Sequence, residues 1–271
     1  MNITRIPSLN QHLCAANPEP VSYDVARHAW YEFRTAHGHR TAVAPYMSEP
    51  NQKIVKNQIP TISFTGNPAR TSGLNACTAS TPQCRAMCIR YTGRLDLPKS
   101  QAVADTRMRF LAAHPDEACS LIYWETFRFA RKHAGNVGRR LNVVTDLRWE
   151  DFAPWLFEWS MPDVLNYDYT KHWDRDRMPF PNYRLTFSAT ERHTPDDIRV
   201  QVDTGANVAV VFPHTHKETG YPETWHGMPL INGDVDDWRF GDPEGVVVAL
   251  YAKGRARKAP VGWDKFVKEI R

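Results

Sequence analysis

Seven short segments of mostly apolar residues follow one another along the chain after residue 60, and polar residues follow each of them. Continuous apolar character, in contrast to strict alternation, is typical of strands that are buried on both faces of a parallel sheet. The pattern therefore predicts seven parallel strands. Their expected ranges are 61–65, 141–145, 164–167, 183–187, 208–212, 230–231 and 246–251.

The chain between these segments predicts helices of unequal length. Ser100 is expected to cap a first helix, Pro115 to begin a second one and Gly135 to end it. Another helix is expected over residues 151–160, whereas residues 171–182 are barely long enough for a parallel crossover and predict a degraded helix. Strands that alternate with helices predict an α/β fold, here a partial or complete (β/α) barrel of parallel strands.

The first 60 residues differ from the rest of the chain. Prolines interrupt them repeatedly, and only one helix is expected there, over residues 23–35. We therefore predict an irregular N-terminal extension over residues 1–60 and one barrel domain over residues 61–271.

The composition is that of a folded globular protein. Of the 271 residues, 42% are hydrophobic and 24% are charged, which excludes a largely disordered chain. No apolar run approaches the ~20 residues of a membrane-spanning helix, and the N-terminus lacks the apolar core of a secretory signal. We therefore expect no membrane partner and a cytoplasmic location. The formal net charge of +4 permits a nucleic-acid partner without requiring one.

Three of the five cysteines lie close together after the first predicted strand. Cys77, Cys84 and Cys88 have the spacing C-x6-C-x3-C, and soft thiolates select zinc, copper(I) or iron–sulfur clusters. A structural zinc site usually has four protein ligands, so three thiolates leave one coordination position open for chemistry. The alternatives are a structural zinc completed by a distant histidine and chance clustering. Cys14 and Cys119 are expected to be ordinary residues.

Polar residues at the ends of the predicted strands are the other candidates for the site. The strands of a (β/α) barrel place their carboxyl ends at one mouth, and the cysteine segment opens onto the same mouth. Asp146, Lys171, Ser188, Asp234 and Lys253 follow separate apolar segments. We therefore expect these five residues to line one cavity together with the three cysteines.

Most of these residues have a functional interpretation and a plainer one. A lysine such as Lys171 at a barrel mouth holds a carboxylate or a phosphate, whereas most lysines are simply solvated. Asp146 either binds a ligand or caps a helix, and the hydroxyls of Ser188 and Thr190 either bind a ribose or stabilise turns. Lys253 begins a basic run that either guides a phosphate-bearing substrate or forms a solvated face.

Two further clusters suggest a metal. His214 and His216 place both rings on one face of an extended segment, which would suit a barrel metallohydrolase. Asp234, Asp236 and Asp237 suggest magnesium-assisted phosphoryl chemistry. This acidic segment is explained more simply if only Asp234 faces the mouth and the other two acids are solvated.

A cysteine trio directly after the first strand of a partial barrel resembles the radical S-adenosylmethionine superfamily. Residues 60–258 also resemble a bacteriophage family called gene product 88-like, through four segments. These segments are 75–88, 168–171, 188–190 and 233–254. The cysteine spacing departs from the superfamily's usual C-x3-C-x2-C, and Thr145-Asp146 stands where the superfamily has Gly-Gly-Glu.

The superfamily resemblance implies a [4Fe–4S] cluster on Cys77, Cys84 and Cys88, with S-adenosylmethionine bound to the fourth iron. An external donor then supplies the electron that cleaves the sulfonium bond and gives a 5′-deoxyadenosyl radical. The residues expected to bind S-adenosylmethionine are Asp146, Ser188, Thr190 and Arg192, and those expected to act on the substrate are Lys171, Asp234 and Lys253.

The sequence therefore predicts an iron–sulfur enzyme that performs radical chemistry on a small molecule, a nucleotide or a nucleic acid in the cytoplasm of the phage's host. The alternative is a non-catalytic phage or host-interaction protein, in which the cysteine segment holds a structural metal.

Overall fold

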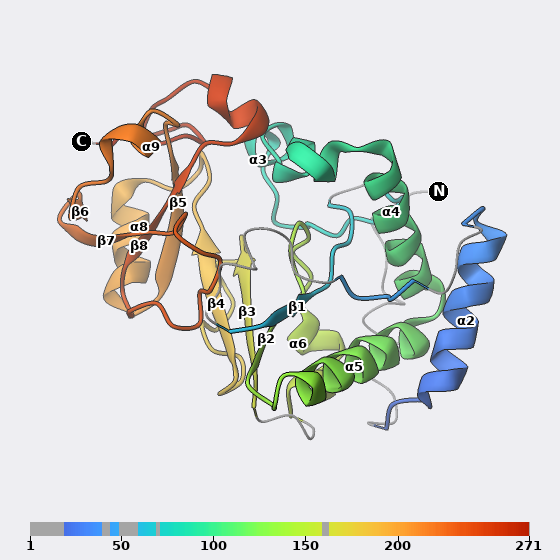
Figure 1. Ribbon diagram of the computed structural model, residues 1–271. Coiled ribbons are helices and arrows are strands. Elements are labelled where there is room, and N and C mark those ends of the chain that lie inside the picture. The colour runs from blue at the N-terminus through green and yellow to red at the C-terminus, as the bar shows by residue number, and fades with distance from the viewer. Residues whose placement is uncertain (1–18, 40–43, 49–58, 69–70, 159–162, 271) are drawn as a thin grey trace.

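The computed structural model of the chain describes residues 19–39, 44–48, 59–68, 71–158 and 163–270. Eight strands form one sheet with the order β1-β2-β3-β4-β5-β8-β7-β6, and helices pack beside it (Figure 1). All neighbouring strands are parallel except β6 and β7, which are antiparallel. The predicted α/β class and the predicted parallel strands are therefore confirmed.

The strands are β1 Thr61–Ser63, β2 Val137–Arg140, β3 Val164–Thr170, β4 Tyr183–Ser188, β5 Asn207–Phe212, β6 Thr224–Trp225, β7 Met228–Asn232 and β8 Val247–Tyr251. The α-helices are α2 Tyr23–Ala36, α3 Pro82–Ala86, α4 Pro98–Ala113, α5 Pro115–Lys132, α6 Trp149–Phe152, α7 Trp155–Glu158, α8 Pro195–Asp203 and α9 His216–Thr219. Three 3-10 helices are η2 Ile89–Tyr91, η3 Gly93–Asp96 and η4 Gly254–Lys258.

The sheet does not close into a barrel. In the described part of the chain, β1 and β6 are the two edges of the sheet and do not pair with each other. The first five strands nevertheless pair in the order in which they occur in the sequence. All their carboxyl ends consequently lie at the same edge of the sheet.

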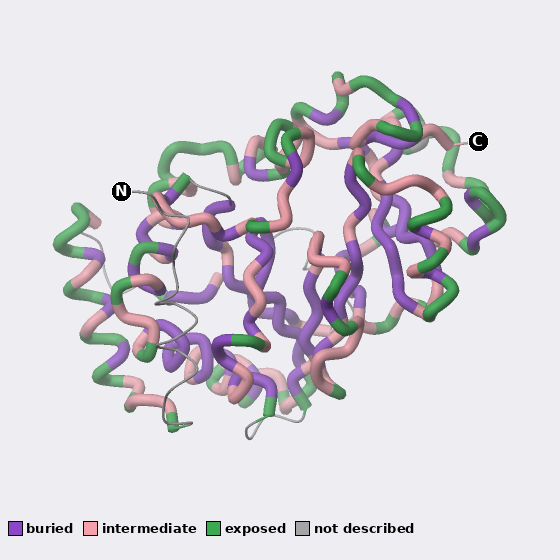
Figure 2. The backbone as a smooth tube through the Cα atoms, turned by 180° about the vertical axis from the view of Figure 1, so that it is seen from behind, coloured by how far each residue is buried: buried purple, intermediate pink, exposed green. Residues whose placement is uncertain are grey.

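The core lies mainly between the sheet and the helices α2, α4 and α5, and the strands form the buried centre of the molecule (Figure 2). Trp30 of α2 packs against the rings of Tyr46 and Phe110, at centroid distances of 5.0 Å to each. Ser22 caps α2 by accepting a hydrogen bond from the backbone N–H of Val25. Parts of the predicted N-terminal extension thus pack on the sheet domain, while residues 1–18, 40–43 and 49–58 lie outside the described residues.

The strand predicted over residues 141–145 is wrong, because the second strand occupies Val137–Arg140. This segment has two arginines where the prediction looked for an apolar run, and both arginines are buried. Arg139 donates hydrogen bonds to the Asn166 side chain and the Leu156 carbonyl. Residues 141–145 instead form a loop that carries the chain toward the cysteine segment.

The third strand is longer than predicted. It continues to Thr170, so Asp168 lies within the strand and does not follow it. Asp168 is buried and accepts hydrogen bonds from the Asn142 backbone N–H and the Tyr183 hydroxyl. These two donors satisfy a carboxylate that would otherwise be costly to bury.

The predicted helices are confirmed with small changes at their ends. Pro115 begins α5, and Gly135, with φ of +91°, follows its end and donates its N–H to the Ala130 carbonyl. Ser100 is not the cap of α4, because Pro98 supplies the first helical turn and Leu97 precedes it.

The connections after β2 and β3 agree in part with the helices that the sequence predicts there. The helix expected over residues 151–160 is divided into α6 and α7, with Pro154 between them, and residues 159–160 lie outside the described range. Residues 171–182 contain no helix, in line with the degraded crossover expected there. No helix among the described residues combines the length and the apolar composition that a membrane crossing requires.

Candidate functional site

A cavity of about 570 Å³ opens at the carboxyl edge of the sheet. Its walls come from the loops after β1, β2 and β3 and from the inner face of β4, β5 and β8. Apolar side chains such as Val143, Val211 and Leu250 cover much of the wall. Seven of the residues predicted for the site line this one cavity: Cys77, Cys84, Cys88, Asp146, Lys171, Ser188 and Lys253.

The three cysteines are half-buried, form no disulfide and are held by short local motifs. The backbone N–H of Cys77 donates to the Asn75 side chain at 3.2 Å. Thr81 caps α3 by accepting from the backbone N–H of Cys84, and Cys88 precedes η2. These motifs fix the backbone of the segment, and all three cysteines line the cavity.

As the side chains stand, the described residues contain no group of three His, Cys, Asp or Glu that could hold a metal ion. The assignment of the three cysteines as metal ligands therefore stays a prediction. Cys119 is buried in the core on α5, as expected, and Cys14 lies outside the described residues.

Lys171 is a cation of the cavity wall that lies near all three cysteines and Asp146. Burial lowers the pKa of Lys171, but the neighbouring Cys84, Asp146, Cys77 and Cys88 raise it by more, so its pKa is above the usual value. Burial in turn raises the pKa of the Cys88 thiol, against a smaller opposing influence of Lys171. The ammonium group therefore lies where it interacts with all three thiols.

Asp146 connects this lysine to the loop after β2. Its Oδ2 accepts the backbone N–H of Lys171 at 2.8 Å, and its Oδ1 lies 3.6 Å from the Arg175 guanidinium. Oδ1 is buried and accepts no hydrogen bond in the described structure. Arg175 also forms an ion pair with Glu150, with 2.6 Å between Nη2 and Oε2, and this pair helps to hold the loop.

Three predicted site residues lie outside the cavity lining. Thr190 is buried, and its backbone N–H donates to His193 Nδ1 at 3.0 Å, while Arg192 is exposed. Asp234 forms an ion pair with Lys253, so it holds a cavity residue without lining the cavity itself.

The two alternative metal clusters gain no support from the described residues. Asp236 pairs with Arg239 and Asp237 pairs with Arg140, so these two acids have separate partners. His214 is half-buried, and the side chain of His216 lies outside what the structure describes.

The buried ion pair between Arg140 and Asp237 is a site feature that the sequence did not reveal. Both residues line the cavity and are more than nine-tenths buried. The Arg140 guanidinium also lies 5.0 Å from the ring centroid of Tyr169, whose buried hydroxyl has no hydrogen-bond partner in the described structure. Since 97 residues separate the two partners, no spacing in the sequence identified them.

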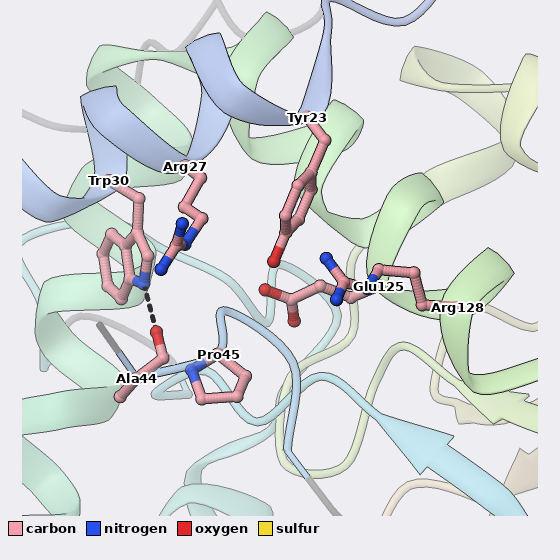
Figure 3. Close-up of a pocket in the computed structure, with 7 residues that line it drawn as sticks. All are labelled: Tyr23, Arg27, Trp30, Ala44, Pro45, Glu125 and Arg128. Carbon is pink, nitrogen blue, oxygen red and sulfur yellow. Dashed lines mark hydrogen bonds between the residues drawn. The ribbon is translucent and has the colours of Figure 1, made fainter. Parts of the chain in front are cut away.

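A smaller cavity of about 230 Å³ lies between α2 and α5 (Figure 3). Two of its side chains, Glu125 and Trp30, bond to one segment of backbone. Glu125 accepts the backbone N–H groups of Tyr46 and Met47, and Trp30 Nε1 donates to the Ala44 carbonyl. We therefore assign this cavity to the packing of the N-terminal segment.

Comparison with known proteins identifies the family. Residues 37–265 match the family described as gene product 88. The chain belongs to the gene product 88 family. No curated protein and no solved structure matches the chain. The predicted resemblance to this family is thus confirmed, whereas these comparisons give no support to the resemblance to the radical S-adenosylmethionine superfamily.

The Arg140–Asp237 pair generates a prediction about stability. Replacing Asp237 by Asn leaves a buried guanidinium without its counter-charge, so Asp237→Asn should lower the free energy of unfolding by about 3 kcal/mol in urea titrations. Asp203→Asn is the control, because Asp203 is exposed on α8, and it should change stability by less than about 0.5 kcal/mol. Equal effects of the two substitutions would contradict the importance of the pair. The double substitution Arg140→Met with Asp237→Leu should recover much of the loss.

His193 generates a prediction about pH. Its ring stacks on Trp173 at a centroid distance of 3.8 Å, and its Nδ1 must be unprotonated to accept from Thr190. Burial, aided by Lys268, lowers the pKa of His193 to about 4. Between pH about 6.5 and about 4 the unfolded chain therefore binds a proton that the folded chain does not, so stability falls as the pH falls.

We expect the difference in free energy of unfolding between wild type and His193→Gln to shrink by up to about 3 kcal/mol over this pH window. Urea titrations at each pH measure it. The control is His28→Gln, since His28 is exposed on α2, and this substitution should leave the pH dependence of the wild type unchanged. A constant difference between wild type and His193→Gln would show that His193 titrates normally.

Proposed function

We propose that the cavity binds a [4Fe–4S] cluster through Cys77, Cys84 and Cys88, and that the protein is an enzyme that uses S-adenosylmethionine for radical chemistry. One observation carries the proposal. Three half-buried thiols line a single cavity at the carboxyl edge of a parallel sheet, with a lysine ammonium among them. Parallel α/β sheets bind their ligands at this edge.

The number of thiols favours a cluster over a structural zinc ion, which usually has four protein ligands. As the side chains stand, no group of three His, Cys, Asp or Glu among the described residues could hold a metal ion, so the proposal rests on the three cysteines lining one cavity. Three thiolates hold three of the irons and leave the fourth open to a small-molecule ligand.

The charges around the thiols also suit such a cluster. Metal ligation requires thiolates, and Cys88 favours the neutral thiol when no metal is bound because it is buried. Lys171 supplies a positive charge that offsets the negative charge of three thiolates. Its role in the proposal is electrostatic, since it already interacts with all three sulfurs.

In this proposal, two residues bind S-adenosylmethionine. The buried Oδ1 of Asp146, which accepts no hydrogen bond, is an acceptor for the ammonium group of the ligand. The Ser188 hydroxyl lies at the end of β4 in the cavity wall, where it suits a ribose. Thr190 and Arg192 lie outside the lining, so the proposal assigns them no contact with the ligand.

Held by Cys77, Cys84 and Cys88 and reduced by an external donor, a cluster would supply the electron for reductive cleavage of S-adenosylmethionine and so the radical chemistry on the substrate. The chain's own contribution is to hold the ligands and to exclude water. Val143, Val211 and Leu250 provide an apolar wall in which a reactive radical meets few competing partners. In the proposal Lys253, which pairs with Asp234, holds an anionic group of the substrate.

The fold and the cysteines complete the proposal. The consecutive parallel order of β1 to β5 supports a partial (β/α) barrel as the scaffold. None of the four described cysteines forms a disulfide, which fits a location in the reducing cytoplasm of the host cell.

Single cysteine substitutions test the proposal. After anaerobic reconstitution with iron and sulfide, the wild-type protein should be brown and absorb near about 400 nm, and it should form 5′-deoxyadenosine with dithionite and S-adenosylmethionine. Cys77→Ala, Cys84→Ala and Cys88→Ala should each lose both the absorbance and the product. Cys119→Ala is the matched control and should keep both, because Cys119 is buried on α5 outside the cavity lining.

Two results would contradict the proposal in different ways. A colourless protein that holds one zinc ion would favour the non-catalytic alternative with a structural metal. A fully loaded cluster that does not cleave S-adenosylmethionine would retain the iron–sulfur assignment and reject the radical chemistry.

A further inference from the structure

The positive charge of the protein is concentrated in two short segments, residues 82–99 and 253–260. They contain eight of the 34 Lys and Arg residues but one of the 30 Asp and Glu residues. Removing their charge of +7 from the net charge of +4 leaves −3 for the rest of the chain. The mild basicity of the protein therefore arises from these two segments.

The fold brings the two segments together at the mouth of the cavity. The helix η2 of the first segment packs against η4 of the second, and the Arg255 guanidinium lies 3.6 Å from the ring centroid of Tyr91. Gly254, with φ of +52°, permits this approach, because a Cβ there would lie 2.5 Å from Thr92 Oγ1. Figure 1 shows α3 and the red η4 segment at the same end of the molecule.

We call this surface the basic rim and define it by its exposed cations, which are Arg85, Arg94, Arg255, Arg257 and Lys258. Arg85 itself lines the cavity, as do Thr92, Leu95 and Ala256, which are close in sequence to the others. The rim therefore borders the opening of the proposed active site.

The charges of the basic rim are not neutralised by acidic side chains of the described structure. None of the five makes an ion pair with an acidic side chain in the described structure. Arg85 donates to the Ser80 carbonyl and hydroxyl, and Arg255 covers Tyr91. Lys253 differs from them, because it pairs with Asp234.

An exposed aromatic side chain accompanies the rim. Trp263 is 61% exposed, which is unusual for a residue of its size. Its segment is fixed to the cysteine region, since the Phe266 backbone N–H donates to the Gln83 side chain at 3.0 Å. Cations that follow a backbone of phosphates, combined with aromatic rings on which bases stack, are the usual features of a surface that binds single-stranded nucleic acid.

We infer that the basic rim binds a single strand of nucleic acid and directs one of its nucleotides into the cavity as the substrate. The nucleotide's role as substrate rests on the proposed function, whereas the binding of the strand does not. A cavity of about 570 Å³ is of the size that holds a small-molecule ligand. A single strand is required because a base within a duplex cannot reach an enclosed site.

Fluorescence anisotropy with labelled DNA and RNA strands of about 20 nucleotides tests the inference, on the full chain with and without a reconstituted cluster. Affinity should fall as salt rises from about 50 to 200 mM. The triple substitution Arg255→Gln, Arg257→Gln and Lys258→Gln should weaken binding at least tenfold. The slope of log affinity against log salt should also become shallower by about 2, because each of the three lost phosphate contacts contributes about 0.7 to it.

Two further variants separate specific effects from general ones. Arg109→Gln, Arg131→Gln and Lys132→Gln remove the same charge from exposed positions on α4 and α5, outside the cavity lining, and should keep the affinity within about twofold. Trp263→Ala should weaken binding about tenfold without changing the salt slope, because stacking is not ionic.

Three results would overturn the inference: no binding of either strand at about 50 mM salt, equal losses in the rim and control variants, or binding to vesicles of phosphatidylserine and phosphatidylcholine but not to the strands. The formation of 5′-deoxyadenosine is assayed separately without any strand. Failure of that assay would reject the proposed function and leave the binding of nucleic acid standing.

Discussion

The parallel pairing of the first five strands is the constraint on which the site depends. Since β1 to β5 pair in sequence order, the loops that follow them emerge at one edge, and the cysteine segment, Asp146 and Lys171 come from three consecutive loops. The register also fixes which side chains face the cavity. Val211 pairs with Leu250, and both line the cavity wall. A slip of one residue would turn this apolar surface away from the site.

The same sheet carries an unusual amount of buried charge. Arg139 and Arg140 are neighbours on the short strand β2, and their side chains reach Asn166 and Asp237 respectively. Buried charges of this kind are costly unless they are paired and hydrogen-bonded. Because Arg140 and Asp237 also line the cavity, a substitution at either residue would change both the packing of the sheet and the polarity of the proposed site.

The sequence predicted the strands whose burial comes from apolar side chains, and it failed where burial comes from paired charges. β5 and β8 are continuous apolar runs and were placed to within a residue or two of their observed ends, whereas the second strand was placed on the apolar run 141–145 and not on Val137–Arg140. Among the predicted site residues, Lys171, Ser188 and Lys253 lie within two residues of the end of a strand and line the cavity. Thr190 lies two residues beyond the end of β4, where the chain has already turned to bond with His193. Asp237 depends on a long-range partner, which no local pattern contains.

The central claim is that the three thiols hold a cluster with one iron open to S-adenosylmethionine. Mössbauer spectroscopy of protein reconstituted with iron-57 tests it most directly, because the spectrum resolves irons by their ligands. We predict the signal of a four-iron cluster, in which adding S-adenosylmethionine changes one iron site and leaves the other three as they were. A spectrum that does not change on adding S-adenosylmethionine, or iron bound without inorganic sulfide, would contradict the account.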